Sequence, residues 1–403
     1  MWWSNGGQGR RGRGWRCIAL PALFPRSDVC VACVCLSGPG CSGLMALLTE
    51  HGPVRPDGAG GLTAFPWAWN RLANTLYVEA PAGVGFSYSL NASDYTTGDA
   101  KTANDNVLAL LQFYERFPQL QSNPLFLASE SYGGHYLPEL GALLVSPQWA
   151  PKFPQFAGGL LGNPLTDMVE GWIYGQGGTL CGHALASRPA CDAYRSACIG
   201  NFSLVTCASA LVGVYLEAGA MVDPLLDTYG LDYPVCPTSG RARRQFGEAA
   251  QMIRMVLQAP LDEEEIAARS PLSDEHQLAV ELVRAMRAAF AEHPEGSKIL
   301  RQSVRAARRS NSPVPPPYSP CMSGEETVYL NRADVRAALH VSPHAAAEWV
   351  QCTGVGQLHY SLLDFILPME QYYLPLLAQG SLSLAIFSGD DDLMCATLGT
   401  EHW

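Results

Sequence analysis

Short apolar runs alternate with amphipathic stretches along much of the chain. The runs at residues 76–78 and 125–128 predict buried strands, because they are short, uncharged and bounded by loop residues. Between residues 102 and 118 apolar positions recur at helical spacing, and Pro118 predicts the end of that helix. We expect another helix at residues 135–144. Strands that alternate with helices predict an α/β fold with a mostly parallel central sheet.

The middle of the chain has a different pattern. It carries several cysteines, a helical apolar face at residues 274–292 and a proline-rich linker that ends near residue 320. We interpret it as a helical, disulfide-bearing cap that is inserted between sheet strands, with two further strands expected at residues 159–161 and 384–387. The predicted organisation is a leader outside the fold at residues 1–36, a first core segment at 37–170, the cap insertion and linker at 171–320, and a second core segment at 321–403.

Composition excludes several classes of protein. With 48% hydrophobic and 16% charged residues, the chain of 403 residues can bury a large core and does not resemble a disordered protein. Its net charge of −11 argues against nucleic acid as a partner. No apolar run approaches the roughly 18 residues of a membrane span. The basic N-terminus leads into an apolar run that Pro21 interrupts, so no clear signal peptide is present.

The cysteines favour an oxidising compartment. Thirteen of them, spread along a large domain, suit a secretory-pathway protein with several disulfides. The sequons at Asn91 and Asn201 are candidate glycosylation sites in the same setting. Cys30, Cys33 and Cys35 have a spacing found in metal sites, but no second cluster lies nearby, and we expect no metal.

Ser131 is the strongest candidate for catalysis. It follows the strand predicted at residues 125–128, precedes the helix predicted at 135–144 and stands two residues before Gly133. A strand, a sharp turn and a helix make a nucleophile elbow, in which small neighbours let the turn present the serine hydroxyl. Ser129 occupies the position of the usual first glycine, so an ordinary serine helix cap is the alternative.

Six sequence blocks place this turn in a wider context. They lie, in order, at residues 37–42, 79–88, 130–134, 162–167, 329–335 and 389–392. Together they closely resemble the serine carboxypeptidase family, which includes lysosomal and vacuolar carboxypeptidases, over roughly residues 37–403. The resemblance implies an α/β-hydrolase fold and a catalytic triad in the chain order Ser, Asp, His.

The resemblance also assigns roles to individual residues. Ser131 matches the nucleophile and Asp392 the triad acid, although a solvated turn carboxylate is the alternative for Asp392. The backbone N–H groups of Tyr132 and Gly38 match the oxyanion hole, which stabilises the charge that develops on the substrate oxygen. The resemblance implies no cofactor.

Recognition of a free C-terminus is the second implied feature. Glu50, Glu130 and Ser37 match the positions that bind the substrate carboxylate, while Leu36 and Ser37 stand where the family has Asn and Gly. Two carboxyl groups held close together cannot readily both ionise, so such a pair keeps a proton and can donate it in a hydrogen bond at acidic pH.

The third member of the triad has no match in this sequence. In the family it follows the Asp in a G-H-x-x-P context, whereas only eleven residues (403 − 392) follow Asp392 here. His402 aligns with a different segment, so we assign no catalytic base and expect a chain truncated at both ends. The resemblance further implies the disulfides Cys41–Cys352 and Cys236–Cys321, with Cys181, Cys191, Cys198 and Cys207 pairing among themselves in one of three ways.

The sequence thus predicts a serine-type carboxypeptidase that acts on the C-termini of peptides or proteins through an acyl-enzyme, in a lysosome or vacuole or after secretion. Two alternatives stay open: an inactive hydrolase-like binding protein that lacks the catalytic His, and a carboxypeptidase-like acyltransferase. The sequence does not decide between a monomer and a homo-oligomer.

Overall fold

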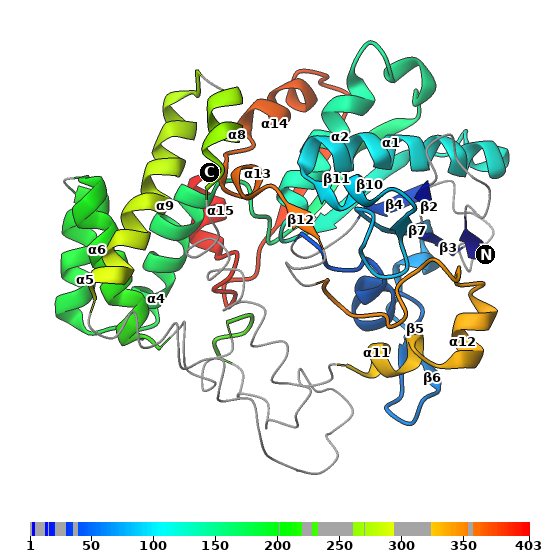
Figure 1. The fold of residues 1–403 in the computed structure, drawn as a ribbon, viewed down its shortest axis with the longest axis horizontal. Helices are drawn as coiled ribbons and strands as arrows, with labels where there is room; N and C mark the ends of the chain where they lie inside the picture. The colour runs from blue at the N-terminus through cyan, green and yellow to red at the C-terminus, as the bar shows by residue number, and fades with distance from the viewer. Residues whose placement is uncertain are drawn as a thin grey trace. The chain divides into compact units, whose positions relative to one another are not determined.

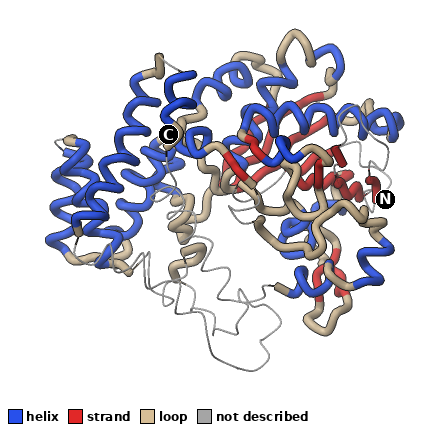
Figure 2. Tube along the Cα trace, in the orientation of Figure 1, coloured by secondary structure: helices blue, strands red, loops and turns tan. Residues whose placement is uncertain are grey.

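The computed structural model describes residues 39–200, 202–219, 228–232, 261–269, 271–293, 324–353 and 358–403, with the backbone of four short strands before residue 35. Contacts divide the chain into two compact units. The first comprises Met1–Pro164, Gly324–Ser361 and Met369–Phe387, and the second comprises Leu165–Ser323, Leu362–Pro368 and Ser388–Trp403. The described strands all belong to the first unit, while the second unit is built from helices (Figure 2).

A seven-stranded sheet organises the described part of the first unit. Its order is β1 (Trp2–Ser4), β3 (Arg16–Leu20), β7 (Asn74–Glu79), β4 (Cys30–Val34), β10 (Leu125–Glu130), β11 (Phe156–Gly162) and β13 (Ser383–Phe387). The five strands from β7 to β13 run parallel, and β3 and β1 continue the sheet in antiparallel pairing. This confirms the predicted α/β fold with a mostly parallel sheet.

The strands before residue 35 differ from the prediction. We expected residues 1–36 to lie outside the fold, yet β1, β3 and β4 all pair within the sheet, and β4 lies between β7 and β10. The sequence of β4, Cys-Val-Ala-Cys-Val, is entirely apolar and suits a strand with neighbours on both sides. It was missed because an apolar run of five residues shows neither the alternation nor the helical period that marks an element.

Helices α1 (Asp99–Arg116) and α2 (Gly133–Val145) lie side by side in the first unit, and α2 packs on β10 and β11 (Figure 1). Gly159 of β11 permits this packing, since a Cβ atom there would lie 2.9 Å from a methyl carbon of Leu137. Helix α14 (Glu370–Leu377) also contacts α2. Helix α1 begins at Asp99, three residues before the predicted start at residue 102. The Gly98 backbone carbonyl accepts the Thr102 N–H at this end, and no polar side chain caps the helix.

Shorter elements complete the first unit. They are η1 (Ala46–Glu50), β5 (Val54–Pro56), β6 (Leu62–Ala64), η2 (Trp69–Arg71), β2 (Arg13–Gly14), β8 (Tyr88–Ser89), η3 (Ala92–Tyr95), β9 (Thr96–Thr97), η4 (Pro118–Leu120), η5 (Ala150–Lys152), α11 (Glu325–Leu330), α12 (Ala333–Ala338) and β12 (His359–Tyr360).

The second unit packs helix against helix. Helix α9 (Asp274–Glu292) matches the helix predicted at residues 274–292, and its apolar face lies against α6 (Leu204–Glu217). The other described helices of this unit are α3 (Met168–Glu170), η6 (Gly171–Gly177), α4 (Gly178–Gly182), α5 (Arg188–Tyr194), η7 (Arg195–Gly200), α8 (Glu263–Ala268), α13 (Leu362–Ile366) and α15 (Thr397–His402). Among the described helices, none combines the length and apolarity that a membrane crossing requires.

Candidate active site

The turn between β10 and α2 holds Ser131 in a left-handed backbone conformation, with a φ of 54°. The Ser131 N–H donates to the Gly162 carbonyl over 3.1 Å, and the Gly134 N–H donates to the Ser131 carbonyl over 3.0 Å. A non-glycine residue in this region costs about 1–3 kcal/mol and persists where its surroundings impose it. An ordinary helix cap has an extended backbone, so the geometry favours the nucleophile elbow over the helix-cap alternative.

Tyr132 follows the serine and immediately precedes α2. Its side chain is fully buried and stacks on the His135 ring, with ring centroids 4.4 Å apart. The Tyr132 hydroxyl donates to the Asp99 carboxylate over 2.9 and 3.1 Å. The second predicted oxyanion donor, Gly38, and the predicted carboxylate ligand Ser37 lie outside the described residues.

Glu50 and Glu130 are joined by a hydrogen bond between their side chains, and Glu130 immediately precedes Ser131. Burial raises the pKa of Glu50 well above its usual range, and the neighbouring Glu130 raises it further. Burial also raises the pKa of Glu130, against a smaller lowering by its bond with Glu50. The Glu50 side chain is still 35% exposed and Glu130 is an exposed residue, so both carboxyl groups also reach solvent. The pair therefore retains a proton at a pH where an isolated glutamate is ionised.

His51 adds no positive charge beside this pair, whereas the Arg55 charge partly offsets the rise in the pKa of Glu50. Its ring stacks on Trp69 with centroids 4.1 Å apart, and its Nδ1 atom lies 3.0 Å from the Tyr77 hydroxyl. Burial lowers the pKa of His51 to about 4. Although its Nε2 atom lies 4.0 Å from Glu50 Oε2, the ring is neutral above that pH and does not favour ionisation of Glu50.

Glu79 organises a second polar cluster at the end of β7. Its fully buried carboxylate accepts hydrogen bonds from the Ser42 hydroxyl, from Trp349 Nε1 over 2.9 Å and from the Phe86 N–H over 2.9 Å. Gly85, at a φ of 53°, makes room for it, because a Cβ atom there would lie 1.7 Å from Glu79 Oε1. The cluster ties the segment after residue 38 to β7 and to the segment before Cys352.

Asp392 belongs to the second unit. Its carboxylate accepts backbone N–H bonds from Met394 over 2.8 Å and from Cys395 over 3.3 Å, which hold the turn before α15. His402, in the same unit, pairs with Glu170 and stacks on Tyr174, with ring centroids 3.5 Å apart. The role of Asp392 as triad acid stays a prediction.

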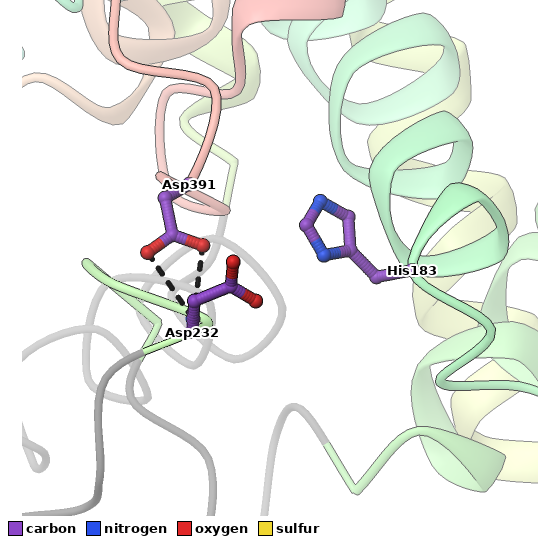
Figure 3. Close-up of side chains that lie close together, drawn as sticks. All are labelled: His183, Asp232 and Asp391. Atoms are coloured by element: carbon purple, nitrogen blue, oxygen red, sulfur yellow. Dashed lines mark hydrogen bonds between the residues drawn. The ribbon is translucent and has the colours of Figure 1, made fainter.

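One group of candidate cation ligands lies in the described part of the second unit. His183, Asp232 and Asp391 each place a ligand atom within 4.8 Å of the others (Figure 3). The Asp391 carboxylate already accepts the Asp232 N–H over 2.9 and 3.1 Å, and His183 and Asp232 are exposed. These hydrogen bonds account for the position of Asp391, so we assign no metal to the group.

Comparison with known proteins decides the family. The family model described as serine carboxypeptidase matches residues 36–403, which is most of the chain. The chain belongs to the serine carboxypeptidase family. Its fold is also that of a prohormone-processing carboxypeptidase from Saccharomyces cerevisiae, with a TM-score of 0.61 at 14% identity, over 96% of this chain and 71% of that one.

Individual relatives support this membership of the serine carboxypeptidase family. The chain is 32% identical to the lysosomal protective protein of Mus musculus over 385 residues, covering 90% of this chain and 68% of that protein. It is 29% identical to serine carboxypeptidase 1 of Hordeum vulgare, covering 91% and 69%, and 29% identical to serine carboxypeptidase-like 44 of Arabidopsis thaliana, covering 90% and 64%. The chain therefore spans about two thirds of the length of these carboxypeptidases.

The disulfides agree with the family pattern where they are described. Cys41 and Cys352 are bonded across 311 positions of sequence, as the resemblance implied. The structure selects one of the three open pairings, Cys181–Cys191 with Cys198–Cys207. The predicted partners Cys236 and Cys321 lie outside the described residues.

The structure describes one of the two predicted glycosylation sites. Asn91 is exposed and caps the short helix η3, where its side chain accepts the Ser93 N–H over 3.2 Å. Its modification stays a prediction. Asn201 lies outside the described residues.

Sequence reasoning missed two residues at the centres of the polar clusters. Glu79 opens one of the family blocks, and a carboxylate directly after the apolar run at residues 76–78 could have marked a buried acceptor. Asp99 carried no comparable signal. Its partner Tyr360 lies 261 positions away, and only the folded chain brings the two together.

Proposed function

We propose that this protein is a serine carboxypeptidase that removes residues from the C-termini of peptides at acidic pH, through an acyl-enzyme on Ser131. Family membership supports the reaction class, and the left-handed turn supports Ser131 as the nucleophile. The first unit would supply the nucleophile and the groups that recognise the substrate C-terminus.

The Glu50–Glu130 pair next to Ser131 is the observation that carries this proposal. Raised pKa values leave the pair protonated at acidic pH, where it can donate a hydrogen bond to a substrate carboxylate. As the pH rises through these raised values, both groups ionise and repel the same carboxylate. Substrate binding is therefore expected to be tight on the acidic side and to weaken towards neutral pH.

The chemistry then proceeds in two steps. The Ser131 Oγ attacks the carbonyl carbon of the last peptide bond, and a general base accepts the hydroxyl proton. The backbone N–H groups of Tyr132 and Gly38 stabilise the oxyanion, the C–N bond breaks, and the C-terminal residue leaves as the protonated amine. Water next hydrolyses the Ser131 ester and releases the shortened peptide. We assign Asp392 to orient the base, and we assign the base to none of the histidines described above.

We propose a lysosomal, vacuolar or secreted location for the protein. The disulfides of both units suit an oxidising compartment. One relative is named for the lysosome. Peptide C-termini are the proposed substrates in that compartment.

Hydrolysis of a blocked dipeptide tests the proposal. The protein would be made in a secretory host, both as given and with any residues that its transcript encodes after Trp403. We expect release of the C-terminal amino acid from the free acid at acidic pH, and little release from the matching C-terminal amide. The Ser131→Ala variant is the control and should release nothing.

Three results would redirect the assignment. Equal hydrolysis of acid and amide would contradict carboxylate recognition by Glu50 and Glu130. Hydrolysis that survives Ser131→Ala would contradict the nucleophile. Transfer of the acyl group to an added alcohol in preference to water would favour the acyltransferase alternative.

A further inference from the structure

We propose that Asp99 is a positioning residue for the nucleophile turn, acting through the side chain of Tyr132. The proposal concerns a buried group that we call the Asp99 cluster: Asp99, Tyr132, His135 and Tyr360. It rests on the proposed function only in naming Ser131 as the nucleophile, because the cluster itself is defined by its contacts.

The Asp99 carboxylate receives hydrogen bonds from all three partners. Tyr132 Oη lies 2.9 Å from Oδ1 and 3.1 Å from Oδ2, and His135 Nδ1 lies 3.1 Å from Oδ2. The Tyr360 hydroxyl donates to Oδ1. Burial, and next the Asp99 charge, raise the pKa of Tyr360 well above its usual range, so this hydroxyl stays a donor. A carboxylate that accepts this many bonds in a buried setting is held firmly in place.

The cluster is tightly packed, with three of its residues buried and Tyr360 partly buried. Asp99 is 4% exposed, while Tyr132 and His135 are 0% exposed. The Tyr132 ring is stacked on His135 and meets Tyr360 edge-on, with centroids 6.0 Å apart. The Tyr132 side chain is therefore fixed on two sides by rings and at its hydroxyl by Asp99.

Three segments that are distant in sequence meet in this group. Asp99 begins α1 directly after β9, and β9 pairs in parallel with β12, which carries Tyr360. Tyr132 is the N-cap residue of α2, and His135 lies in the first turn of that helix. The Asp99 cluster thus anchors the start of α2 to α1 and to β12, all within the first unit.

The Asp99 cluster lies next to the backbone that holds Ser131. Ser131 is in a strained conformation, and its backbone is hydrogen-bonded to Gly162 and Gly134. Fixing the Tyr132 side chain limits the rotation of the peptide unit that joins residues 131 and 132. That peptide supplies the N–H proposed for the oxyanion hole, so its orientation decides whether the donor faces the reacting oxygen.

Amide hydrogen exchange in the folded protein tests this role without requiring activity. In the Asp99→Asn variant we expect exchange of the amides at residues 131–136 to accelerate about tenfold, since a charge-assisted hydrogen bond is lost at that point. Helices α6 and α9 of the second unit should exchange as in the unmutated protein. Tyr132→Phe removes one donor and keeps the backbone N–H, and it should produce a smaller increase in the same peptide.

Asp94→Asn is the matched control. Asp94 is also a buried carboxylate of the first unit, which accepts the Ser89 hydroxyl over 2.6 Å and pairs with Lys101 over 3.4 Å. It should change exchange near residues 89–101 and leave residues 131–136 unaltered. Equal effects of Asp99→Asn and Asp94→Asn on residues 131–136 would overturn the proposal in favour of a general contribution to stability.

Labelling by a serine-reactive fluorophosphonate provides the kinetic readout. Asp99→Asn should lower the maximal rate of labelling at Ser131 about tenfold and leave the half-saturating probe concentration unchanged, because it disturbs orientation rather than probe binding. A variant that changes only the half-saturating concentration would contradict positioning. Failure of the unmutated protein to label would contradict the proposed function alone, because exchange decides the role of Asp99 independently.

Discussion

Two regions of the first unit hold their carboxyl groups in opposite ways. Around Glu79 and Asp99, hydrogen-bond donors converge on a single carboxylate. At Glu50 and Glu130, one carboxyl group faces another, and burial and mutual proximity raise the pKa of Glu50. The same functional group thus serves as a hydrogen-bond acceptor that anchors its neighbours in one region and as a proton-holding donor in the other.

The difference shows how the surroundings of a carboxyl group set its role. A carboxylate with several donors keeps its charge and fixes the elements that supply those donors. A carboxyl group beside another carboxyl group keeps a proton and can bind an anion. Changing Glu to Gln therefore removes an anchor in the first region, whereas it preserves a neutral donor in the second.

Glu79→Gln is expected to produce the largest loss of stability. Its amide group would face the Ser42, Phe86 and Trp349 donors, and breaking such a buried charged network costs about 3–5 kcal/mol. Chemical denaturation would measure the free energy of unfolding. The control Glu348→Gln changes an exposed side chain next to Trp349 and should cost under about 0.5 kcal/mol. Similar losses for both variants would remove Glu79 from its proposed role as an anchor.

Loss of the Cys41–Cys352 disulfide is expected to have the next largest effect on stability. It links the segment near the Glu79 cluster across 311 positions, so replacing both cysteines with alanine should cost about 2–4 kcal/mol by freeing the unfolded chain. The Cys198–Cys207 bond spans only nine positions, and its removal should cost less. Thermal unfolding of both variants checks the order, and a reversed order would contradict it.

Glu50→Gln should change the pH dependence more than the stability. The unmutated protein is expected to lose affinity for free-acid substrates as the pH rises through the raised pKa values of the pair. The Gln variant keeps a neutral donor, so at neutral pH its KM should be about tenfold lower than that of the unmutated protein, while at acidic pH the two should converge. Parallel KM profiles would contradict the shared-proton interpretation.

Glu50→Gln should also change how the free energy of unfolding depends on pH. Folding raises the pKa of Glu50. The stability that this shift contributes is therefore fully present below the pKa of the unfolded chain, about 4.5, and is lost as the pH rises through the pKa of the folded protein. Glu50→Gln should therefore gain stability relative to the unmutated protein towards neutral pH. Denaturation at two pH values measures this difference.

Local signals predicted the parts of the fold that depend on neighbouring residues. The strand, turn and helix around Ser131 were visible because an apolar run, small residues and a helical period follow one another within twenty residues or so. The strands before residue 35 were not predicted, since β4 is a short apolar run whose partners β7 and β10 lie far along the chain. Six ordered blocks identified the family more securely than any single motif.

The residues of the candidate site also differ in whether the sequence alone marks them. Glu130 and Ser131 are adjacent in sequence, and the resemblance supplied Glu50. No feature of the neighbouring sequence marked Asp99 or Tyr360, because the two residues meet only when the parallel pairing of β9 with β12 joins their segments. Polar groups that meet through tertiary contacts are the part that sequence patterns leave undetermined.

The most direct test of the central claim is the site at which a fluorophosphonate probe reacts. After labelling at acidic pH and digestion, mass spectrometry should find the adduct on the peptide that contains Ser131, and Ser131→Ala should abolish it. An adduct on another residue, or labelling that persists in Ser131→Ala, would contradict the assignment of this strained turn as the nucleophile.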